Sequence, residues 1–253
     1  MDVLYIGDDK LKSDQFFSGA ENIQVFQRRI KDYEPLLETL ENAQDITPEH
    51  KGGVETIETF PESTEELLEY DALIISDLSR GTLTPHFYPD AIPGPNKLRI
   101  IKEFVKNGGG LLYCGGWMTF QGYKGAGNWQ GTPVEDVLPV EIQPIFDDRV
   151  ECPEGRETTI IDTEHYVTKT IGESFPDVFG YNKTGELKDD AQLLAEVDGN
   201  PLIATGEYGA GKTLVYSSDP GIKWGLDLVE WDKYDEFWTR ALKWVTNDVE
   251  PAQ

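Results

Sequence analysis

Three short apolar segments constrain the fold of this chain most. Residues 2–7 (DVLYIG), 72–76 (ALIIS) and 111–114 (LLYC) each have the length and composition of a strand that is buried on both faces. Helical patterns lie between them. The clearest is at residues 96–107, where Asn96 is a suitable N-cap and apolar residues recur at helical spacing. This alternation predicts a parallel sheet with helices on both faces.

The second half of the chain predicts a different arrangement. Residues 192–197, 202–207 and 213–217 read as three strands, and the turn sequences DGN and YGAG that separate them are typical of hairpins. Residues 229–247 form an amphipathic pattern whose aromatic stripe is expected to pack into the core. We therefore expect antiparallel hairpins to extend the parallel sheet.

Four further segments carry local expectations. Residues 13–20 suggest a short helix or loop, and residues 23–26 suggest a short strand. Residues 54–60 alternate apolar and polar side chains, which favours a strand. Residues 85–95 are rich in proline and are expected to form a loop.

The charge of the chain restricts its partners. Its 253 residues carry a formal net charge of -25, which argues against binding to nucleic-acid backbones or to anionic membranes. The N-terminal sequence lacks the features of a signal peptide, and no apolar run is long enough to span a membrane, so a cytoplasmic protein is expected. Two cysteines do not make a disulfide framework.

The long segment after residues 111–114 is the first candidate for a functional site. It is rich in glycine and aromatic residues, and ligands collect at the carboxyl ends of parallel strands. Asp77 and Asp219 each follow a predicted strand that ends at the same edge of the sheet. The alternatives are that these acids cap turns and that the loop fills the edge itself. The predicted ligand-binding residues are Asp77, Gly115, Gly116, Trp117, Thr119, Asp219 and Trp224.

Cys114 is the candidate nucleophile, because it lies at the end of a predicted strand. A reactive thiol needs a nearby cation to lower its pKa, and none of His50, His86 and His165 follows a late strand. The alternative is a small buried apolar side chain. No residue spacing suggests a metal site, so we predict neither a metal nor a cofactor.

Residues 206–213 match the phosphate-binding pattern GxxxxGK[ST]. That motif needs a helix after its lysine, so that amides at the helix N-terminus face the phosphates. The residues that follow here are TLVYS, which favour a strand. The sequence therefore predicts a hairpin that binds no nucleotide.

Four stretches together resemble the glutamine-amidotransferase-like proteins of the class I glutamine amidotransferase-like superfamily. They are SDLSRGTLTP at 76–85, the block from 94 to 140, DDRVECPEG at 147–155 and PLIATGEYGAGKTLVYSSDPGIKWG at 201–225. The resemblance covers nearly the whole chain. It implies one domain over residues 1–253 with an α/β fold, a flavodoxin-like three-layer sandwich with a mostly parallel central sheet and hairpin additions in its C-terminal half.

The resemblance also bears on activity. In class I amidotransferases the nucleophilic cysteine lies at a tight elbow after a buried strand, which corresponds here to Gly115 or to Cys114. Their histidine and glutamate follow a late strand, whereas residues 217–224 of this chain read SSDPGIKW, with Lys223 before the tryptophan. These departures predict that the chain lacks glutaminase activity.

Three functions remain open from the sequence. The first is an amidotransferase-like domain that binds a small molecule or a protein at the carboxyl edge of the sheet. The second is a hydrolase that uses Cys114, or Asp77 with Asp219. The third is a structural or assembly protein, in which the aromatic loop packs against a neighbouring subunit of a homo-oligomer.

Overall fold

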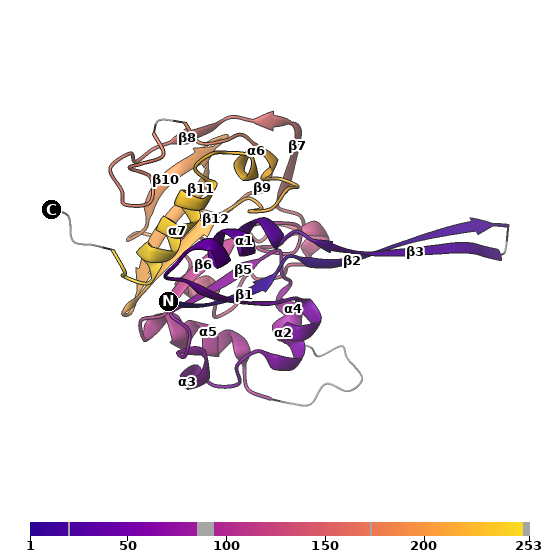
Figure 1. Cartoon of the computed structure of the whole chain (residues 1–253), viewed down its shortest axis with the longest axis horizontal. Coiled ribbons are helices and arrows are strands. Elements are labelled where there is room, and N and C mark those ends of the chain that lie inside the picture. The colour runs from indigo at the N-terminus through magenta and orange to yellow at the C-terminus, as the bar shows by residue number, and fades with distance from the viewer. Residues whose placement is uncertain (20, 85–93, 173, 250–253) are drawn as a thin grey trace.

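An eight-stranded mixed sheet forms the centre of the computed structural model, which describes residues 1–19, 21–84, 94–172 and 174–249 (Figure 1). Its strands, in spatial order, are β4 (Thr47–Lys51), β1 (Asp2–Gly7), β5 (Ala72–Ser76), β6 (Gly110–Cys114), β12 (Gly211–Tyr216), β11 (Asn200–Tyr208), β10 (Gln192–Val197) and β8 (Thr158–Ile160). The first five are parallel, and the last three continue the sheet in antiparallel fashion. The parallel strands follow the order of flavodoxin-like folds, as predicted, with the switch point between β1 and β5.

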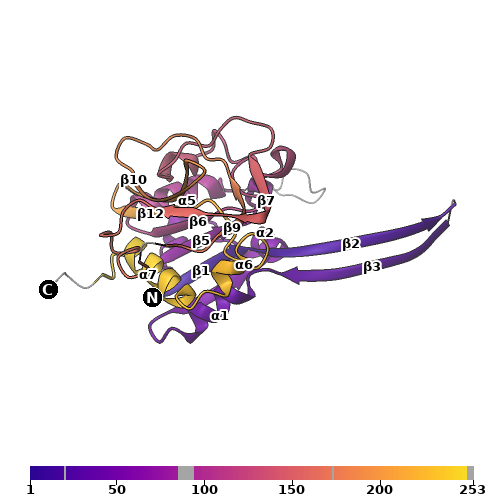
Figure 2. The same ribbon diagram turned by 90° about the horizontal axis from the view of Figure 1, so that it is seen from above.

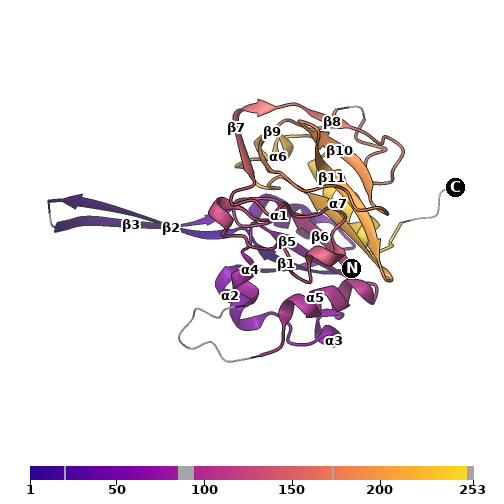
Figure 3. The same ribbon diagram turned by 180° about the vertical axis from the view of Figure 1, so that it is seen from behind.

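Helices cover both faces of the sheet (Figures 1 and 3). One layer contains α1 (Glu34–Asn42), α6 (Leu226–Val229) and α7 (Tyr234–Val245), and the other contains α2 (Gly53–Thr59), α3 (Thr64–Leu67), α4 (Arg80–Leu83) and α5 (Lys97–Lys106). Side chains alternate along the parallel strands, so the sheet contributes to two apolar cores. Tyr5 packs toward α7, for example, and Leu4 toward α5. The described part of the chain contains no helix that is both long and apolar enough to cross a membrane.

A β-ribbon corrects the expectation for residues 13–20 and lengthens the strand expected at residues 23–26, which lie within it. β2 (Asp9–Ser18) begins directly after β1 and pairs in antiparallel fashion with β3 (Glu21–Lys31). The ribbon points away from the body of the molecule in two perpendicular views (Figures 1 and 2). The sequence pattern failed here because short polar and apolar stretches alternate without the continuous apolar run that marks a core strand.

A second correction concerns residues 54–60, where a strand was expected. Residues Gly53–Thr59 form helix α2, in which Val54 and Ile57 are spaced three apart on one helix face. The strand lies just before it, at β4, where the polar sequence TPEHK pairs with β1 at the edge of the sheet. An edge strand needs few apolar residues, so its sequence gives little sign of it. Residues 85–93 of the expected proline-rich loop lie outside the described residues.

The remaining elements lie in the C-terminal half and in the long loop. β7 (Arg149–Arg156) pairs with β9 (Val178–Asn182), and the loop contains two short 3₁₀ helices, Tyr123–Gly125 and Glu135–Val137.

The predicted hairpin between β11 and β12 is confirmed. Gly206 pairs with Thr213 across the two strands, and the turn at Gly209 has a φ of +63°. No helix follows Lys212, so the phosphate-binding geometry is absent from this segment.

Candidate functional site

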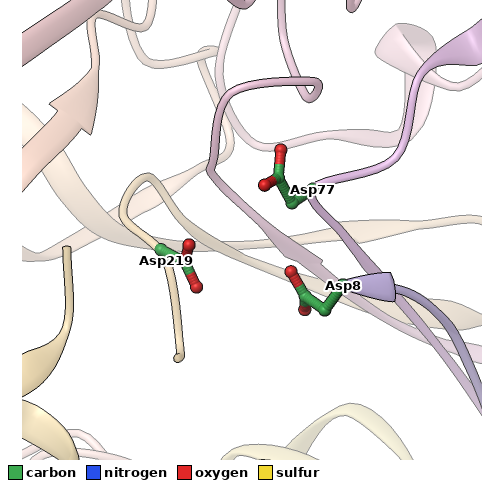
Figure 4. Close-up of side chains that lie close together, drawn as sticks. All are labelled: Asp8, Asp77 and Asp219. Atoms are coloured by element: carbon green, nitrogen blue, oxygen red, sulfur yellow. The ribbon is translucent and has the colours of Figure 1, made fainter. Parts of the chain in front are cut away.

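Three carboxylates converge at the carboxyl edge of the parallel strands (Figure 4). Asp8 directly follows β1, Asp77 directly follows β5, and Asp219 lies three residues beyond the end of β12. One carboxylate oxygen from each residue lies within 4.8 Å of the oxygens from the other two, and all three residues are buried. Asp77 and Asp219, which the sequence places at this edge, therefore lie together, and Asp8 lies beside them. These three residues are called the carboxylate cluster below.

The backbone is strained where two of these acids leave their strands. Asp8 has a φ of 51° and Asp77 a φ of 41°, in the left-handed region that side-chain-bearing residues rarely adopt. The Asp8 amide donates a hydrogen bond to the Ser76 carbonyl at 3.1 Å, which ties the two exits together. Strain of this kind is retained where surrounding structure fixes it, and it occurs often at functional sites.

Two lysines and a fourth acid border the carboxylate cluster. The Lys10 ammonium forms ion pairs with Asp77 and with Asp32, the latter at 3.0 Å. Lys223 reaches the same Asp32 oxygen at 2.8 Å. Four carboxyl groups thus face two ammonium groups. Full ionisation would leave an excess of negative charge in a region that water reaches poorly.

Burial raises the pKa values of Asp8 and Asp219. The pKa of Asp219 rises to about 8, because burial disfavours its charged form and Asp8 repels it. The pKa of Asp8 rises to about 6 through burial, which Lys10 opposes and Asp77 reinforces. Burial lowers the pKa of Lys10, but the surrounding carboxylates outweigh it and hold the pKa above its ordinary value. Near neutral pH the cluster therefore keeps at least one proton that an isolated aspartate would have released.

One carboxylate oxygen of each member of the cluster accepts a hydrogen bond within the chain. The Tyr5 hydroxyl donates to Asp8 Oδ2 at 2.5 Å, the Met118 amide to Asp77 Oδ1 at 2.6 Å and the Gly221 amide to Asp219 Oδ1 at 2.7 Å. Asp8 Oδ1, by contrast, accepts no hydrogen bond from any of the described residues, although it is buried. An unpartnered buried acceptor is costly and suits a donor or a cation that enters from outside.

The two glycines after β6 are required by the protein itself. A Cβ at Gly115 would lie 2.3 Å from the Ser217 carbonyl oxygen, and one at Gly116 would lie 2.6 Å from Asp77 Cγ. Gly116 also has a φ of +141°, which an L side chain rarely adopts. The space beside this strand end is thus filled by Ser217 and Asp77 of the same chain.

Asn182 and Asp148 hold the loop after β6 in place. Asn182 Oδ1 accepts the Gly116 amide at 2.8 Å, and its side-chain amide donates to Asp148 Oδ1 at 2.9 Å. Asp148 also accepts the amides of Gln121 and Gly122 at 2.8 Å. Asp148 is buried and organises the loop.

The predicted aromatic and hydroxyl residues occupy different environments. Trp117 is 41% exposed, and its ring stacks on Tyr123 and lies 4.4 Å from the Arg149 guanidinium. Trp224 is buried, and its indole N–H donates to Glu151 at 3.1 Å. Thr119 is buried too. Of these three, Trp117 alone offers an exposed apolar wall near the carboxyl edge.

Cys114 has the environment of a core residue. It is fully buried at the end of β6, where burial, and after it the carboxylates of Asp8 and Asp219, raise the pKa of its thiol. His50 bonds the Gly7 carbonyl at 2.9 Å and stacks on Tyr33, and His165 lies beside Trp244; His86 lies outside the described residues. Nearby negative charge raises the pKa of a thiol, whereas a thiolate nucleophile needs a nearby cation that lowers it.

We expect Cys114 to be unreactive in the folded protein. Iodoacetamide labelling read by peptide mass spectrometry should leave it unmodified in buffer at pH 8 and modify it fully in urea. Cys152, which is also buried, provides an internal comparison. Rapid modification of Cys114 in buffer, with Cys152 still protected, would contradict the expected high pKa.

The sequence pointed to part of this arrangement. Asp77, Gly115, Gly116 and Asp219 lie together, whereas Trp224 binds Glu151 instead. The sequence reasoning missed Asp8, Lys10, Asp32 and Asn182. Asp8 carries the same signal as Asp77, an acid directly after a buried strand. Lys10 and Asn182 carry none, because they come from the ribbon and from β9, whose positions depend on the whole fold.

Comparison with known proteins places the chain in a family. Residues 2–247 match the family described as putative glutamine amidotransferase. Two solved structures of proteins titled as cytoplasmic, from Salmonella typhimurium and Salmonella typhimurium LT2, share 34% and 31% sequence identity with this chain. Both have a TM-score of 0.89, and each alignment covers 97% of this chain and 99% of the other.

More distant structures share the fold alone. A ThuA-like protein from Bacteroides uniformis has a TM-score of 0.58 at 12% identity, over 96% of this chain and 90% of its own. No curated protein matches the chain. The match over residues 2–247, together with the two Salmonella structures, shows that the chain belongs to the putative glutamine amidotransferase family.

Proposed function

We propose that this protein is a cytoplasmic member of the family that lacks glutaminase activity and binds a small cationic ligand at the carboxylate cluster. The observation that carries the proposal is the convergence of Asp8, Asp77 and Asp219 at the switch point of the sheet. Ligands of doubly wound sheets bind at this position. The cytoplasmic location rests on the two Salmonella relatives, which are described as cytoplasmic proteins.

The charge of the cluster favours a cation over other ligands. Four carboxyl groups face two lysine ammonium groups, and two of the carboxyl groups have raised pKa values. A metal ion or a ligand ammonium group would replace the retained protons and supply the missing partner of Asp8 Oδ1. Oxygen-only ligation also suits Mg²⁺, Mn²⁺ and Ca²⁺.

The proposal implies pH-dependent stabilisation by added cations. A cation competes with protons for Asp8 and Asp219, so Mn²⁺ or putrescine should raise the melting temperature at pH 8 and have little effect at pH 5.5. Differential scanning fluorimetry measures this. Equal shifts at both pH values, or shifts that persist in Asp219→Asn, would place any bound cation elsewhere on the acidic surface.

The absence of glutaminase activity has its own test. The Cys114 thiol stays protonated, so ammonia release from glutamine should equal the buffer blank. A coupled glutamate dehydrogenase assay of the wild-type protein and of Cys114→Ser measures it. Turnover that disappears in Cys114→Ser would show that the thiol is activated, in conflict with its burial.

A second candidate function, acid–base hydrolysis, is favoured by the same pKa values. Asp219 with a pKa near 8 can donate a proton at neutral pH, while Asp8 with a lower pKa can accept one. A screen of p-nitrophenyl esters and phosphates tests this function. It is supported by turnover that Asp219→Asn abolishes and that the surface control Asp227→Asn retains.

A further inference from the structure

Lys10 brings a cation of the chain itself to the carboxylate cluster. It is the second residue of β2, and its ammonium group forms ion pairs with Asp77 Oδ2 and, at 3.0 Å, with Asp32 Oδ2. The other oxygen of Asp77, Oδ1, accepts the Met118 amide. The Asp77 oxygen that remains for a ligand is therefore the one that Lys10 binds. A cation that enters the cluster must compete with this lysine.

The two lysines are distributed unevenly over the four carboxylates. Lys10 and Lys223 bind the same oxygen of Asp32, at 3.0 and 2.8 Å. Asp8 and Asp219, which are buried more completely than any surface acid, form no ion pair with any of the described residues. Asp32 can therefore keep an ammonium group if Lys10 moves away from the cluster, whereas the two buried acids depend on a cation from outside.

The spacing of the cluster suits one metal ion. One carboxylate oxygen from each of Asp8, Asp77 and Asp219 lies within 4.8 Å of the other two, and the three side chains come from three separate strand ends (Figure 4). Divalent ions bind oxygen at about 2.0–2.6 Å, so two oxygens on one ion are at most roughly 5 Å apart. Asp8 Oδ1 is buried and accepts no hydrogen bond from any described residue, and such an ion would satisfy it.

The balance of charge favours a divalent ion over an amine. Four carboxylates face two ammonium groups, so the ionised groups carry two more negative than positive charges. One divalent ion supplies both positive charges at a single point, whereas each ammonium group of an amine supplies one. An amine therefore brings to the cluster no more charge than the Lys10 ammonium group that it would replace.

We propose, on the basis of the cation site proposed above, that its ligand is a divalent metal ion, which binds the carboxylate cluster and displaces the Lys10 ammonium group from Asp77. The displaced ammonium group stays on Asp32 beside Lys223. Lys10 is then a specificity-determining residue. It occupies the cluster against singly charged groups, and it yields to a divalent ion because the attraction to a carboxylate grows with the charge of the cation.

Acylation of Lys10 in the full-length wild-type protein tests the displacement. An ammonium group held between carboxylates stays protonated and reacts slowly with sulfo-N-hydroxysuccinimide acetate. Saturating Mn²⁺ should raise the labelling rate of Lys10 several-fold at pH 8, as read by peptide mass spectrometry. Lys12 is the internal control and should keep its rate, because its side chain is 45% exposed and pairs with Asp14 at the surface. A Lys10 rate that bound Mn²⁺ leaves unchanged would overturn the displacement.

Calorimetric titration of Lys10→Met with Mn²⁺ is the second measurement. Without the competing ammonium group Mn²⁺ should bind about tenfold more tightly than in the wild-type protein, as expected if Lys10 occupies the cluster for about nine-tenths of the time. Lys12→Met removes the same charge from the same strand, and its affinity for Mn²⁺ should stay close to that of the wild-type protein because exposed charges are screened. Equal affinities in Lys10→Met and Lys12→Met would overturn the role of Lys10.

Titration of the wild-type protein with putrescine separates this inference from the proposed function. Tighter binding of Mn²⁺ than of putrescine, lost in Asp219→Asn, supports the metal ion. Putrescine that binds as tightly as Mn²⁺ or more tightly, and that Asp219→Asn abolishes, would overturn the metal ion and leave the proposed cation site standing. Absence of binding by both probes would overturn the metal ion together with the cation site.

Discussion

Lys10→Met should lower the free energy of unfolding by about 3 kcal/mol at pH 8, which is the order expected when one member of a buried charge pair is removed. Lys10 forms ion pairs with Asp77 and Asp32, and the side chains of both acids are almost fully buried. Methionine retains the apolar packing of the lysine stem but leaves these carboxylates without their cation. Urea denaturation of both proteins measures the difference.

The loss of unfolding free energy in Lys10→Met should become smaller as the pH falls to 5. Asp8 and Asp219 then bind protons, which reduces the negative charge that Lys10 balances. Lys12→Met, two residues along the same strand, is the matched control: Lys12 is largely exposed and its partner is Asp14 at the surface. Equal losses of unfolding free energy in the two variants would contradict the excess of negative charge around Lys10. A loss in Lys10→Met that does not depend on pH would contradict it as well.

Asp219→Asn should stabilise the protein at high pH. The pKa of Asp219 is about 8 in the folded state against an ordinary value of 3.8, so the folded protein holds a proton that the unfolded chain has released between these values. Its ionisation therefore opposes folding: the penalty is absent near pH 4, grows as the pH rises and is complete above pH 8. Asparagine removes the charge and keeps an oxygen that can accept the Gly221 amide.

The expected gain in the free energy of unfolding at pH 9 exceeds about 1 kcal/mol, since one pKa unit corresponds to about 1.4 kcal/mol. Near pH 4 the two proteins should be equally stable. Urea denaturation at pH 4, 7 and 9 gives the comparison, with the exposed Asp227→Asn as the control. A variant that is less stable than the wild-type protein at pH 9 would show that the Asp219 carboxylate is a net stabilising charge there.

The fold was predictable where the local sequence pattern of a segment matches the burial of that segment in the structure. β1, β5 and β6 are apolar on both faces because the sheet buries them completely, and α5 carries a cap and an amphipathic pattern. Apart from the strand expected at residues 23–26, the ribbon and β4 were not predictable, because one projects from the body and the other lies at an edge. Their sequences therefore lack the apolar periodicity that burial imposes.

The candidate site divides in the same way. Asp77 and Asp219 could be placed because they follow strands that share an edge, and a consistent application of this rule would have included Asp8. The ion pairs of Lys10 depend on where the ribbon leaves the sheet, and the hydrogen bonds of Asn182 depend on the pairing of β7 with β9. No short-range pattern in the sequence encodes either contact.

Calorimetric titration at pH 8 with Mn²⁺, and separately with putrescine, tests the central claim most directly. Titration in two buffers of different ionisation enthalpy also reports the number of protons released. We expect saturable binding of at least one probe with proton release, lost in Asp219→Asn and retained in Asp227→Asn. The absence of binding by both probes, or binding that Asp219→Asn leaves unchanged, would contradict the proposal that the carboxylate cluster is a cation site.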